Sequence, residues 1–544
     1  MILSKNHLLH GQNLSADICI VGGGPAAISM AMQLALTSLK VIVIAGGGWS
    51  ETRAAQDLHK GVVVPKGSHE PLEQLRRRQF GGASAVWSGR CVPYDPIDLK
   101  DRFWVPASGW PISYEEIEPY YSKASDLCQI GELNFNARQV FPNHQNEIIP
   151  GFDTGEIDSS LLERWSPPTR FAKEYRAELE RSSTIHVLLD AHVLSFQMSG
   201  RSDRITHVEV AADKKRLTIE AAHFVLAAGG IENPRLLLSS KNEYFQNGLG
   251  NQHDNVGRYY MTHIVGTYAK INPYNRENIM FGFEKDKDVY CRRRWGFTEA
   301  AQEENRLMNT IFYLSHPVSV DKRGFAFTSI YNTAKLLVSE TGFRDSLRKA
   351  AKRADYMSRG FGNFYNLGLP SLLPSKNSPY WGLLFQAEQT PNRESRVSLS
   401  DTERDAFGMY RAKVKIAFND RDIESLVNAH NIFMKRFKEC SVGEAVYTEE
   451  GLREFLKGLL SNYNSYAHHI GTTKMSDNPK NGVVDKNSKV FGIDNLFVAS
   501  SSTFPTSSHA NPTLTVVAQS LMLADHLKSI MSERTSSNKC FMKV

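Results

Sequence analysis

The first part of the chain alternates between apolar runs and turn signals in the order strand, helix, strand. Residues 16–21 (ADICIV) form a short apolar run rich in β-branched side chains, which predicts a buried strand. Residues 26–37 are good helix formers, with Ile28 and Met32 on one face, and residues 40–44 (KVIVI) predict a second buried strand. Strand, helix and strand at this spacing predict a parallel βαβ unit.

The pattern changes several times further along the chain. Residues 103–128 carry turn signals followed by an acidic helix, and residues 131–160 are polar and predict a long excursion. Residues 172–180 favour a helix, and residues 185–196 favour a strand pair or one long strand. Residues 224–228 (FVLAA) predict another buried strand, closed by two glycines.

Residues 263–463 are richer in aromatic residues and alternate more between polar and apolar positions, as in residues 381–400. This alternation predicts a second domain built on an antiparallel sheet. After it, residues 495–499 (NLFVA) predict a buried strand and residues 512–528 a helix, so the chain returns to its initial character.

Length and composition agree with a folded chain of several domains. The 544 residues exceed what one hydrophobic core usually organises, and the hydrophobic fraction of 41% and charged fraction of 22% are ordinary for globular proteins. The net charge of +6 is small for this length and is mixed along the chain, which argues against nucleic-acid binding.

Two local basic runs stand out, Arg292–Arg294 and residues 344–359. A solvated helix face is the favoured interpretation, and contact with a membrane surface or an acidic partner is the alternative.

The six cysteines are scattered without a CxxC pair, so neither a disulfide framework nor a metal site is expected. The first residues lack the apolar core of a signal peptide, and the most apolar window, residues 18–36, contains three glycines and a proline. A cytoplasmic protein is therefore expected.

The first chemical motif is Gly22-Gly23-Gly24-Pro25-Ala26, between the first predicted strand and helix. Glycines let the backbone turn tightly and approach a pyrophosphate, and the helix N-terminus presents free N–H groups to it. This context predicts dinucleotide binding rather than a merely structural turn.

The acidic residue expected to hold the ribose at the end of the second strand is absent, because Ala45 stands at that position. Backbone groups or another side chain must then hold the ribose, and this motif alone leaves FAD and a nicotinamide cofactor open.

Several segments resemble the glucose–methanol–choline (GMC) family of flavoproteins, in the family's order and over about two fifths of the chain. The segments are 22–27, 78–98, 224–237, 255–263, 389–400 and above all 468–527. The resemblance implies an α/β fold in which a discontinuous Rossmann-like FAD-binding domain carries a second, α+β substrate domain built on an antiparallel sheet. We therefore expect residues 14–110, 165–262 and 465–532 to form the FAD-binding domain. Residues 263–464 would form the substrate-binding domain and residues 111–164 a connecting excursion.

The resemblance also implies which residues contact FAD. The stretch from Gly81 to Trp87 is similar to the family's loop along the flavin, and adjacent glycines permit close approach to a flat ring. Some sugar oxidases of the family carry a covalently linking histidine at the position of Val86, so valine implies noncovalent FAD. The implied cofactor contacts are Gly22, Gly23, Gly24, Pro25, Ala26, Ala45, Gly81, Gly82, Ser84, Ala85, Val86, Val193, Ala228, Ser500, Ser501, Asn511, Pro512 and Thr513.

Two polar residues of the C-terminal block match the family's catalytic pair. Alcohol oxidation needs a base for the hydroxyl proton and a polar group that holds the oxygen, and histidine suits the first role. By the resemblance His468 is the base and Asn511 the second group, a pairing similar to pyranose oxidases and bacterial sugar dehydrogenases. His469 could replace His468, and His509 could replace Asn511. Asn511 before Pro512 also has the pattern of a helix N-cap, with proline at the first helical position.

The resemblance thus implies an FAD-dependent alcohol or sugar oxidase or dehydrogenase. The substrate would be a small carbohydrate-like alcohol, and O₂, a quinone or a redox protein would reoxidise the flavin. Alternatives are a flavin lyase of the same family, a nicotinamide-dependent dehydrogenase and a noncatalytic FAD-binding subunit.

Overall fold

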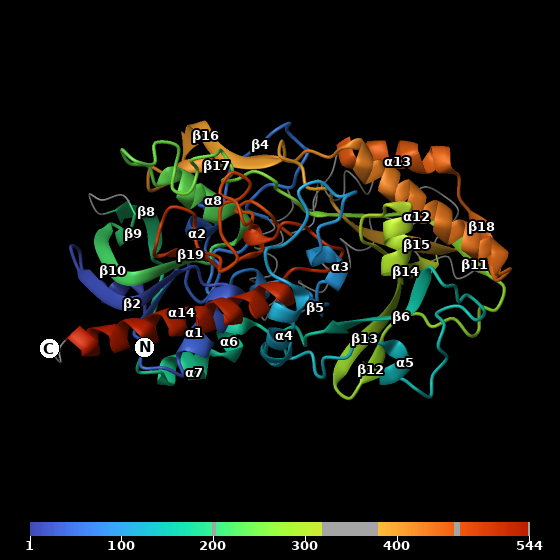
Figure 1. Cartoon of the computed structure of the whole chain (residues 1–544), viewed down its shortest axis with the longest axis horizontal. Helices are drawn as coiled ribbons and strands as arrows, with labels where there is room; N and C mark the ends of the chain where they lie inside the picture. The colour runs from blue at the N-terminus through green and yellow to red at the C-terminus, as the bar shows by residue number, and fades with distance from the viewer. Residues whose placement is uncertain (75, 199–202, 318–378, 462–467, 542–544) are drawn as a thin grey trace, which may run out of the picture.

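The computed structural model describes residues 1–74, 76–198, 203–317, 379–461 and 468–541. Two large sheets lie at opposite ends of the molecule, as Figure 1 shows. Each sheet has its own hydrophobic core. The basic segment at residues 344–359 lies outside the described residues.

The first sheet has a parallel centre. Its strands run in the order β1-β7-β3-β2-β10-β9-β8, and β19 pairs with the end of β10. All pairs are parallel except β10–β9 and β9–β8. The strands are β1 (Ile2–Leu3), β2 (Asn13–Val21), β3 (Val41–Ala45), β7 (Ile185–Leu189), β8 (His192–Met198), β9 (Ile205–Ala212), β10 (Lys215–Leu226) and β19 (Leu496–Val498).

Helices cover both faces of this sheet. On one side, helix α14 (Thr513–Phe541) packs against both α1 (Pro25–Leu34) and α4 (Tyr114–Cys128). The short helices α6 (Phe171–Glu174) and α7 (Arg176–Arg181) lie close to α1. Helix α8 (Gly229–Ser239) lies on the other side, above the sheet in Figure 1. All five residues of β3 are buried, as expected of a central parallel strand covered on both faces.

The second sheet is antiparallel throughout, in the order β18-β11-β15-β14-β13-β6-β5, with β12 paired to β13. Its strands are β5 (Arg90–Cys91), β6 (Ile157–Trp165), β11 (His263–Pro273), β12 (Glu284–Asp286), β13 (Val289–Phe297), β14 (Thr310–Pro317), β15 (Trp381–Glu388) and β18 (Gly443–Val446). Helices α12 (Asp420–Glu439) and α13 (Glu449–Ser461) pack on this sheet through a core that includes Phe385, Phe433 and Leu452.

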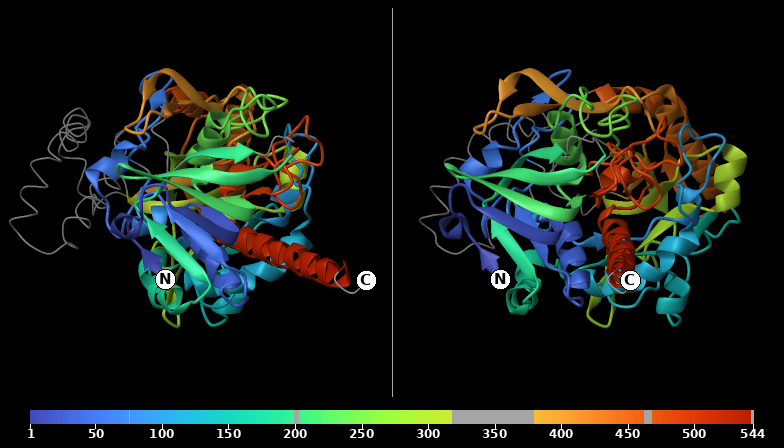
Figure 2. Two further views of the ribbon diagram at one scale, coloured as in Figure 1. Left: turned by 90° about the vertical axis from the view of Figure 1, so that its left-hand side faces the viewer. Right: turned by 60° about the vertical axis from the view of Figure 1, so that its left-hand side comes forward.

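A third, smaller sheet joins distant parts of the chain. Strands β16 (Arg396–Arg404) and β17 (Tyr410–Lys415) pair antiparallel, and β17 also pairs with β4 (Val62–Val63). This sheet packs on α8 and forms the upper edge of the molecule in Figure 2. The remaining short elements are α2 (Arg53–Asp57), α3 (Pro96–Leu99), α5 (Ala137–Val140), α9 (Glu299–Asn305), η1 (Lys5–His7), η2 (Gly82–Ala85) and η4 (Ser501–Thr503).

The predicted βαβ unit, the buried strand before Ala228 and the antiparallel sheet are all present. Residues 185–196 fall in two strands, β7 and β8, which pair with other strands and not with each other. The last helix begins at Thr513 and continues to Phe541 rather than ending near residue 528. The strand boundaries correct the expected division of the chain in two places. Residues 111–164 are more than a connection, because β6 is an inner strand of the second sheet, and β5 joins the same sheet. Residues 396–415 belong to the third sheet, beside α8.

The basic run Arg292–Arg294 is also not a solvated helix face. It lies on strand β13, where Arg293 and Arg294 are buried. Arg292 pairs with Glu163 at 2.8 Å and Arg293 with Glu284 at 2.7 Å, so the charges serve internal ion pairs.

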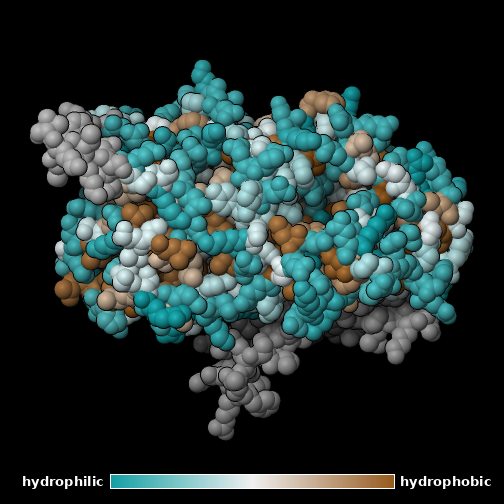
Figure 3. Space-filling view, turned by 60° about the horizontal axis from the view of Figure 1, so that its bottom comes forward, coloured by the Kyte–Doolittle hydropathy of each residue, from teal (hydrophilic) through white to brown (hydrophobic). Residues whose placement is uncertain are grey.

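None of the helices in the described ranges is long and apolar enough to cross a membrane. The side chains on the face shown in Figure 3 are mostly polar, with apolar residues scattered between them. The five cysteines whose side chains are described, Cys19, Cys91, Cys128, Cys291 and Cys440, are free thiols.

Candidate functional site

A cavity of about 270 Å³ opens at the carboxyl ends of the parallel strands. Its wall includes Val21 at the end of β2, Ile44 in β3, Ala227 after β10 and Ala499 after β19. Ligands of open α/β sheets bind at this edge, where loops leave the strands and helices begin.

The glycine turn forms one wall of the cavity. Gly22 has φ of +138°, and a Cβ atom there would lie 2.2 Å from the carbonyl oxygen of Ala227, so only glycine fits. Gly24 precedes α1, with Pro25 at the first helical position, and a Cβ on Gly24 would meet no atom within 4 Å. Gly22, Gly23, Gly24, Pro25 and Ala26 all line the cavity, which leaves the start of α1 accessible to a ligand.

The second glycine pair packs directly on the first. The Gly81 N–H donates to the carbonyl oxygen of Gly23 at 2.7 Å, and a Cβ on Gly82 would lie 3.0 Å from Gly24 Cα. Gly82 and Ser84 line the cavity, whereas Gly81, Ala85 and Val86 are not among its lining residues. Val86 is 41% exposed, so its side chain points away from the core.

Most of the other expected contacts converge on the same space. Val193, Ala228, Ser500, Ser501, Pro512 and Thr513 line the cavity. Ala45 does not, because it is buried at the end of β3 between the lining residues Ile44 and Gly46.

His468 lines the cavity and is held by a second histidine. The Nδ1 atoms of His468 and His263 are 3.0 Å apart, and His263 Nε2 lies 3.0 Å from the carbonyl oxygen of Ser507. A carbonyl only accepts, so His263 Nε2 carries a proton. Burial, and to a smaller extent the nearby His468, lowers the pKa of His263 well below 6.5, so this imidazole is neutral. With its proton on Nε2, the neutral ring has an acceptor at Nδ1.

The proton between the two rings therefore belongs to His468 Nδ1. Burial and the positive charge of Arg90 lower the pKa of His468 to about 4, so this imidazole is neutral near pH 7. A neutral imidazole that is protonated on Nδ1 has its lone pair on Nε2. The contact with His263 thus selects the His468 tautomer whose Nε2 can accept a proton.

Asn511 is fixed from the opposite direction. Its Oδ1 accepts from Arg90 Nη1 at 3.1 Å and from Gln386 Nε2 at 3.2 Å, while Arg90 Nη1 also donates to Gln386 Oε1 at 2.7 Å. These contacts orient the Asn511 amide so that its NH₂ group remains the donor end. Among the described residues, none accepts a hydrogen bond from that group.

Asn511 does not cap the last helix through its side chain, as the Asn-Pro pattern suggested. Helix α14 begins two residues later, at Thr513, and the side-chain oxygen of Asn511 is occupied by Arg90 and Gln386. Asn511 itself does not appear in the wall of the cavity, which continues at Pro512.

The two alternative histidines differ in their surroundings. His469 also lines the cavity but stacks with Tyr260 and His69, at ring-centre distances of 6.0 and 6.2 Å. His509 is completely buried, where it accepts from Arg294 Nη1 at 2.8 Å and contacts Asp95 at 3.0 Å. His509 is therefore committed to a buried ionic cluster.

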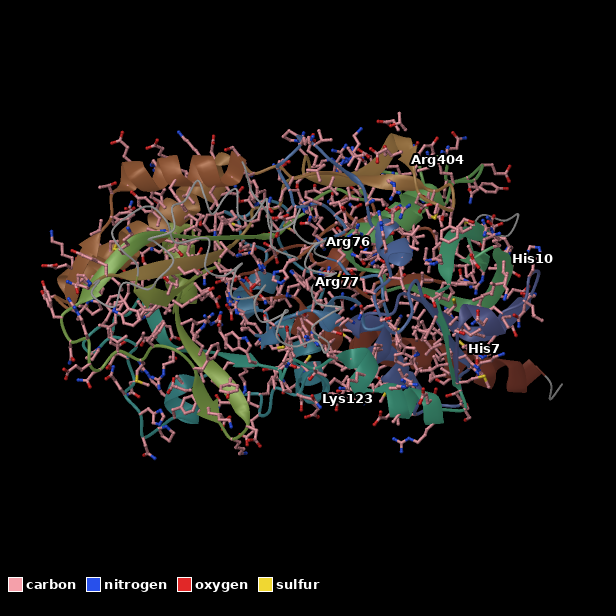
Figure 4. The ribbon with its side chains drawn as sticks, turned by 180° about the vertical axis from the view of Figure 1, so that it is seen from behind. His7, His10, Arg76, Arg77, Lys123 and Arg404 are labelled. Carbon is pink, nitrogen blue, oxygen red and sulfur yellow. The ribbon has the colours of Figure 1, made fainter. Side chains whose placement is uncertain are left out.

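Charged residues that the motifs did not indicate line another part of the cavity. Glu232 on α8 pairs with Arg76 at 2.7 Å, with Arg235 at 3.1 Å and with Arg78 at 3.5 Å. Burial opposes the charge on Glu232, but the three guanidiniums hold its pKa well below 4.5. Figure 4 labels Arg76 and Arg77 near the middle of the molecule, away from His7 and His10 at one end. The only sequence signal for this cluster is the run Arg76–Arg78 shortly before Gly81.

These features suit an elongated anionic ligand such as a dinucleotide. Residues at the beginnings of α1, α8 and α14 line the same cavity, and helix N-termini favour negative charge through free N–H groups and the helix dipole. Among the described residues, no cluster of three or more histidine, cysteine or acidic side chains could hold a metal ion.

Comparison with known sequences agrees with this geometry. The sequence model of the GMC oxidoreductase family matches residues 391–520, the segment that carries both His468 and Asn511. Over these residues the chain is similar to the GMC oxidoreductase family.

Similarity to named enzymes extends over nearly the whole chain. The 2-methyl-1,2-propanediol dehydrogenase of Mycolicibacterium austroafricanum is 22% identical and covers 96% of this chain and 97% of its own. The fructose dehydrogenase large subunit of Gluconobacter japonicus is 21% identical, with coverage of 95% and 98%. The crystal structure of a formate oxidase superimposes with a TM-score of 0.56 at 16% identity, covering 97% of this chain and 100% of that one, which supports a shared fold.

Proposed function

We propose that this protein is an FAD-dependent oxidoreductase of the GMC family that acts on CH–OH groups. The substrate class we propose is a sugar, a glycoside or a similar polar alcohol. The match of residues 391–520 to the GMC family model supports the reaction type, and relatives named for a diol and for fructose support this class of substrate. When bound, FAD supplies the acceptor for the hydride of the alcohol carbon.

The observation that carries this proposal is the 3.0 Å contact between the Nδ1 atoms of His468 and His263, from which the tautomer of His468 is inferred. Its Nδ1–H donates to His263, and its Nε2 keeps a lone pair on a residue that lines the cavity. A neutral imidazole with a pKa of about 4 accepts the hydroxyl proton of an alcohol without first having to lose one. His263 keeps the ring in place while that proton moves to Nε2.

The proposed role of Asn511 follows from its fixed amide. Arg90 and Gln386 hold the carbonyl end, so the NH₂ end can donate to the alcohol oxygen. A donor at that oxygen orients the alcohol and stabilises the negative charge that develops as its proton leaves.

The cofactor would be held without a covalent bond. The glycine turn at Gly22–Gly24 and the beginnings of α1 and α14 suit the pyrophosphate and the flavin. Val86 stands where a linking histidine would be needed, and valine cannot form that bond. We further propose that O₂, a quinone or a redox protein accepts the electrons in the second half of the reaction.

The direct experiment is an anaerobic titration of the purified protein with sugars, glycosides and simple alcohols, followed by flavin absorbance. A substrate should bleach the flavin of the wild type. His468→Ala should slow that reduction by roughly 10²-fold or more, because the base is lost. His10→Ala, at an exposed position, is the matched control and should reduce as the wild type does. Equally fast reduction in the flavin-loaded His468→Ala variant would remove His468 from the mechanism.

A further inference from the structure

The acidic side chain that usually binds the ribose of a dinucleotide is missing from this cavity, and the guanidinium of Arg78 lies near its expected position. Strand β3 ends at Ala45, and Gly46 and Gly47 continue from it along the cavity wall. In dinucleotide-binding folds an acidic side chain at this strand end accepts hydrogen bonds from the ribose hydroxyls. Neither alanine nor glycine offers a side-chain acceptor, so the ribose needs another partner.

The backbone brings Arg78 against this strand end. A Cβ on Gly47 would lie 2.0 Å from the carbonyl oxygen of Arg78, and the Phe80 N–H donates to the carbonyl oxygen of Gly48 at 2.8 Å. The segments around Gly47 and Arg78 therefore lie side by side, at a distance that only glycine allows.

One edge of the Arg78 guanidinium faces Gly46. A Cβ built on Gly46 would lie 3.0 Å from Arg78 Nε and 3.3 Å from Nη2. These two nitrogens carry parallel N–H bonds, the arrangement by which arginine contacts two neighbouring oxygens at once. Arg78 lines the cavity, as do the neighbouring residues His192 and Val193.

The Arg78 guanidinium has an N–H group without a hydrogen-bond partner among the described residues. Arg78 Nη1 is directed to Glu232 Oε2 at 3.5 Å, which anchors the far corner of the guanidinium. Nη2 makes an equally long contact of 3.5 Å with His192 Nδ1, and its second N–H remains for a ligand. The Nε atom is buried, and no acceptor for it exists among the described residues. A buried donor without a partner is costly, and a ligand oxygen at this place would relieve that cost.

Glu232 cannot take the ribose in its place, because both of its oxygens are already engaged. Oε1 accepts from Arg76 at 2.7 Å and Oε2 from Arg235 at 3.1 Å, in addition to the longer contact with Arg78.

We propose that Arg78 binds the adenosine ribose of the dinucleotide, donating through Nε–H and Nη2–H to the oxygens of the 2′- and 3′-hydroxyl groups. The usual polarity is thereby reversed: the ribose oxygens accept from the protein instead of donating to a carboxylate. The proposal rests on the proposed FAD site but on no step of the reaction.

Binding of adenine nucleotides to the full-length protein after removal of its flavin tests this contact without any activity measurement. The wild type should bind ADP roughly tenfold more tightly than 2′-deoxy-ADP, the effect of one hydrogen bond to a charged donor. Arg78→Lys keeps the positive charge but loses the paired N–H groups. This variant should bind the two nucleotides about equally and should bind FAD roughly tenfold more weakly than the wild type.

Arg411→Lys is the matched control, because Arg411 pairs with Asp57 at 3.0 Å and does not line the cavity. It should keep the preference for ADP, and thermal unfolding of each flavin-free variant shows whether it is folded. Equal binding of ADP and 2′-deoxy-ADP by the wild type would overturn the proposal whether or not the variant folds. Tighter binding of adenosine 2′,5′-bisphosphate than of ADP would also overturn it, in favour of a 2′-phosphate. If the wild type binds no FAD, the proposed function fails instead.

Discussion

The titration of His468 sets the expected pH dependence of the proposed reaction. Burial and the positive charge of Arg90 lower its pKa to about 4 from the ordinary histidine value of 6.5. The base works only when deprotonated, so activity should be lost as the pH falls through the lowered pKa and should be present above it. We expect kcat/KM for anaerobic flavin reduction to rise with a midpoint near 4 and to be level above about pH 6. A midpoint near 6.5 would mean that the imidazole is as hydrated as in a free peptide.

Sequence motifs indicated single residues of the cavity wall, as the glycine turn and His468 show. The catalytic roles of His468 and Asn511 stay predictions. The partners of these residues were not predictable, because Arg78, Glu232, His263 and Gln386 come from segments with no pattern of their own and meet only in the folded chain. Asn511 shows how tertiary contacts override a local rule. An Asn-Pro pair usually caps a helix, but here donors from β5 and β15 occupy the amide oxygen.

At the scale of elements, the turn between β2 and α1 allows two glycine substitutions to be compared. In Gly22→Ala the new methyl group would meet the carbonyl oxygen of Ala227 at a positive φ, so the strand end must shift. We expect a loss of about 1–3 kcal/mol in the free energy of unfolding, together with weaker retention of flavin. Thermal and denaturant unfolding of the flavin-free protein measure the first effect.

Gly24→Ala is the matched counterpart. Its φ of −86° suits alanine, and the methyl group would enter open space beside the cavity. The flavin-free protein should be as stable as the wild type, while FAD binding weakens because the methyl group occupies the approach to α1. If both variants lost stability equally, the close contact of Gly22 with Ala227 would not be the cause.

Strands rich in apolar residues were predictable, and strands with buried charges were not. Strand β6 has the sequence IDSSLLERW, which suggests no buried strand, yet Glu163 and Arg164 are completely buried. Glu163 pairs with Arg90 and Arg292, and Arg164 pairs with Asp286. The neighbouring strands that neutralise these charges lie far away in sequence, so hydropathy alone assigns the segment to a loop.

For the whole molecule, a buried ion pair ties the second sheet to the loop after α3. Arg102 donates to both carboxylate oxygens of Glu388 on β15, at 2.7 and 2.8 Å, and both side chains are essentially inaccessible to solvent. Arg102→Met should cost about 3–5 kcal/mol, because it leaves Glu388 buried and unpaired.

The double replacement Arg102→Met with Glu388→Leu is the control for this pair. It should recover much of that loss, since no isolated charge remains. Calorimetric Tm values at saturating FAD would measure both variants. Additive losses in the double variant would show that the two side chains are not energetically coupled.

The order in which the cavity wall appears along the chain has a consequence for biosynthesis. The glycine turn and the first βαβ unit come from the beginning of the chain, but His468, β19 and the start of α14 come from its last part. A ribosome that has translated the first 460 residues has therefore exposed the glycine turn without its opposite wall. Capture of the proposed FAD would have to follow the emergence of residues beyond Val516. Nascent chains and late nonsense truncations should therefore remain flavin-free.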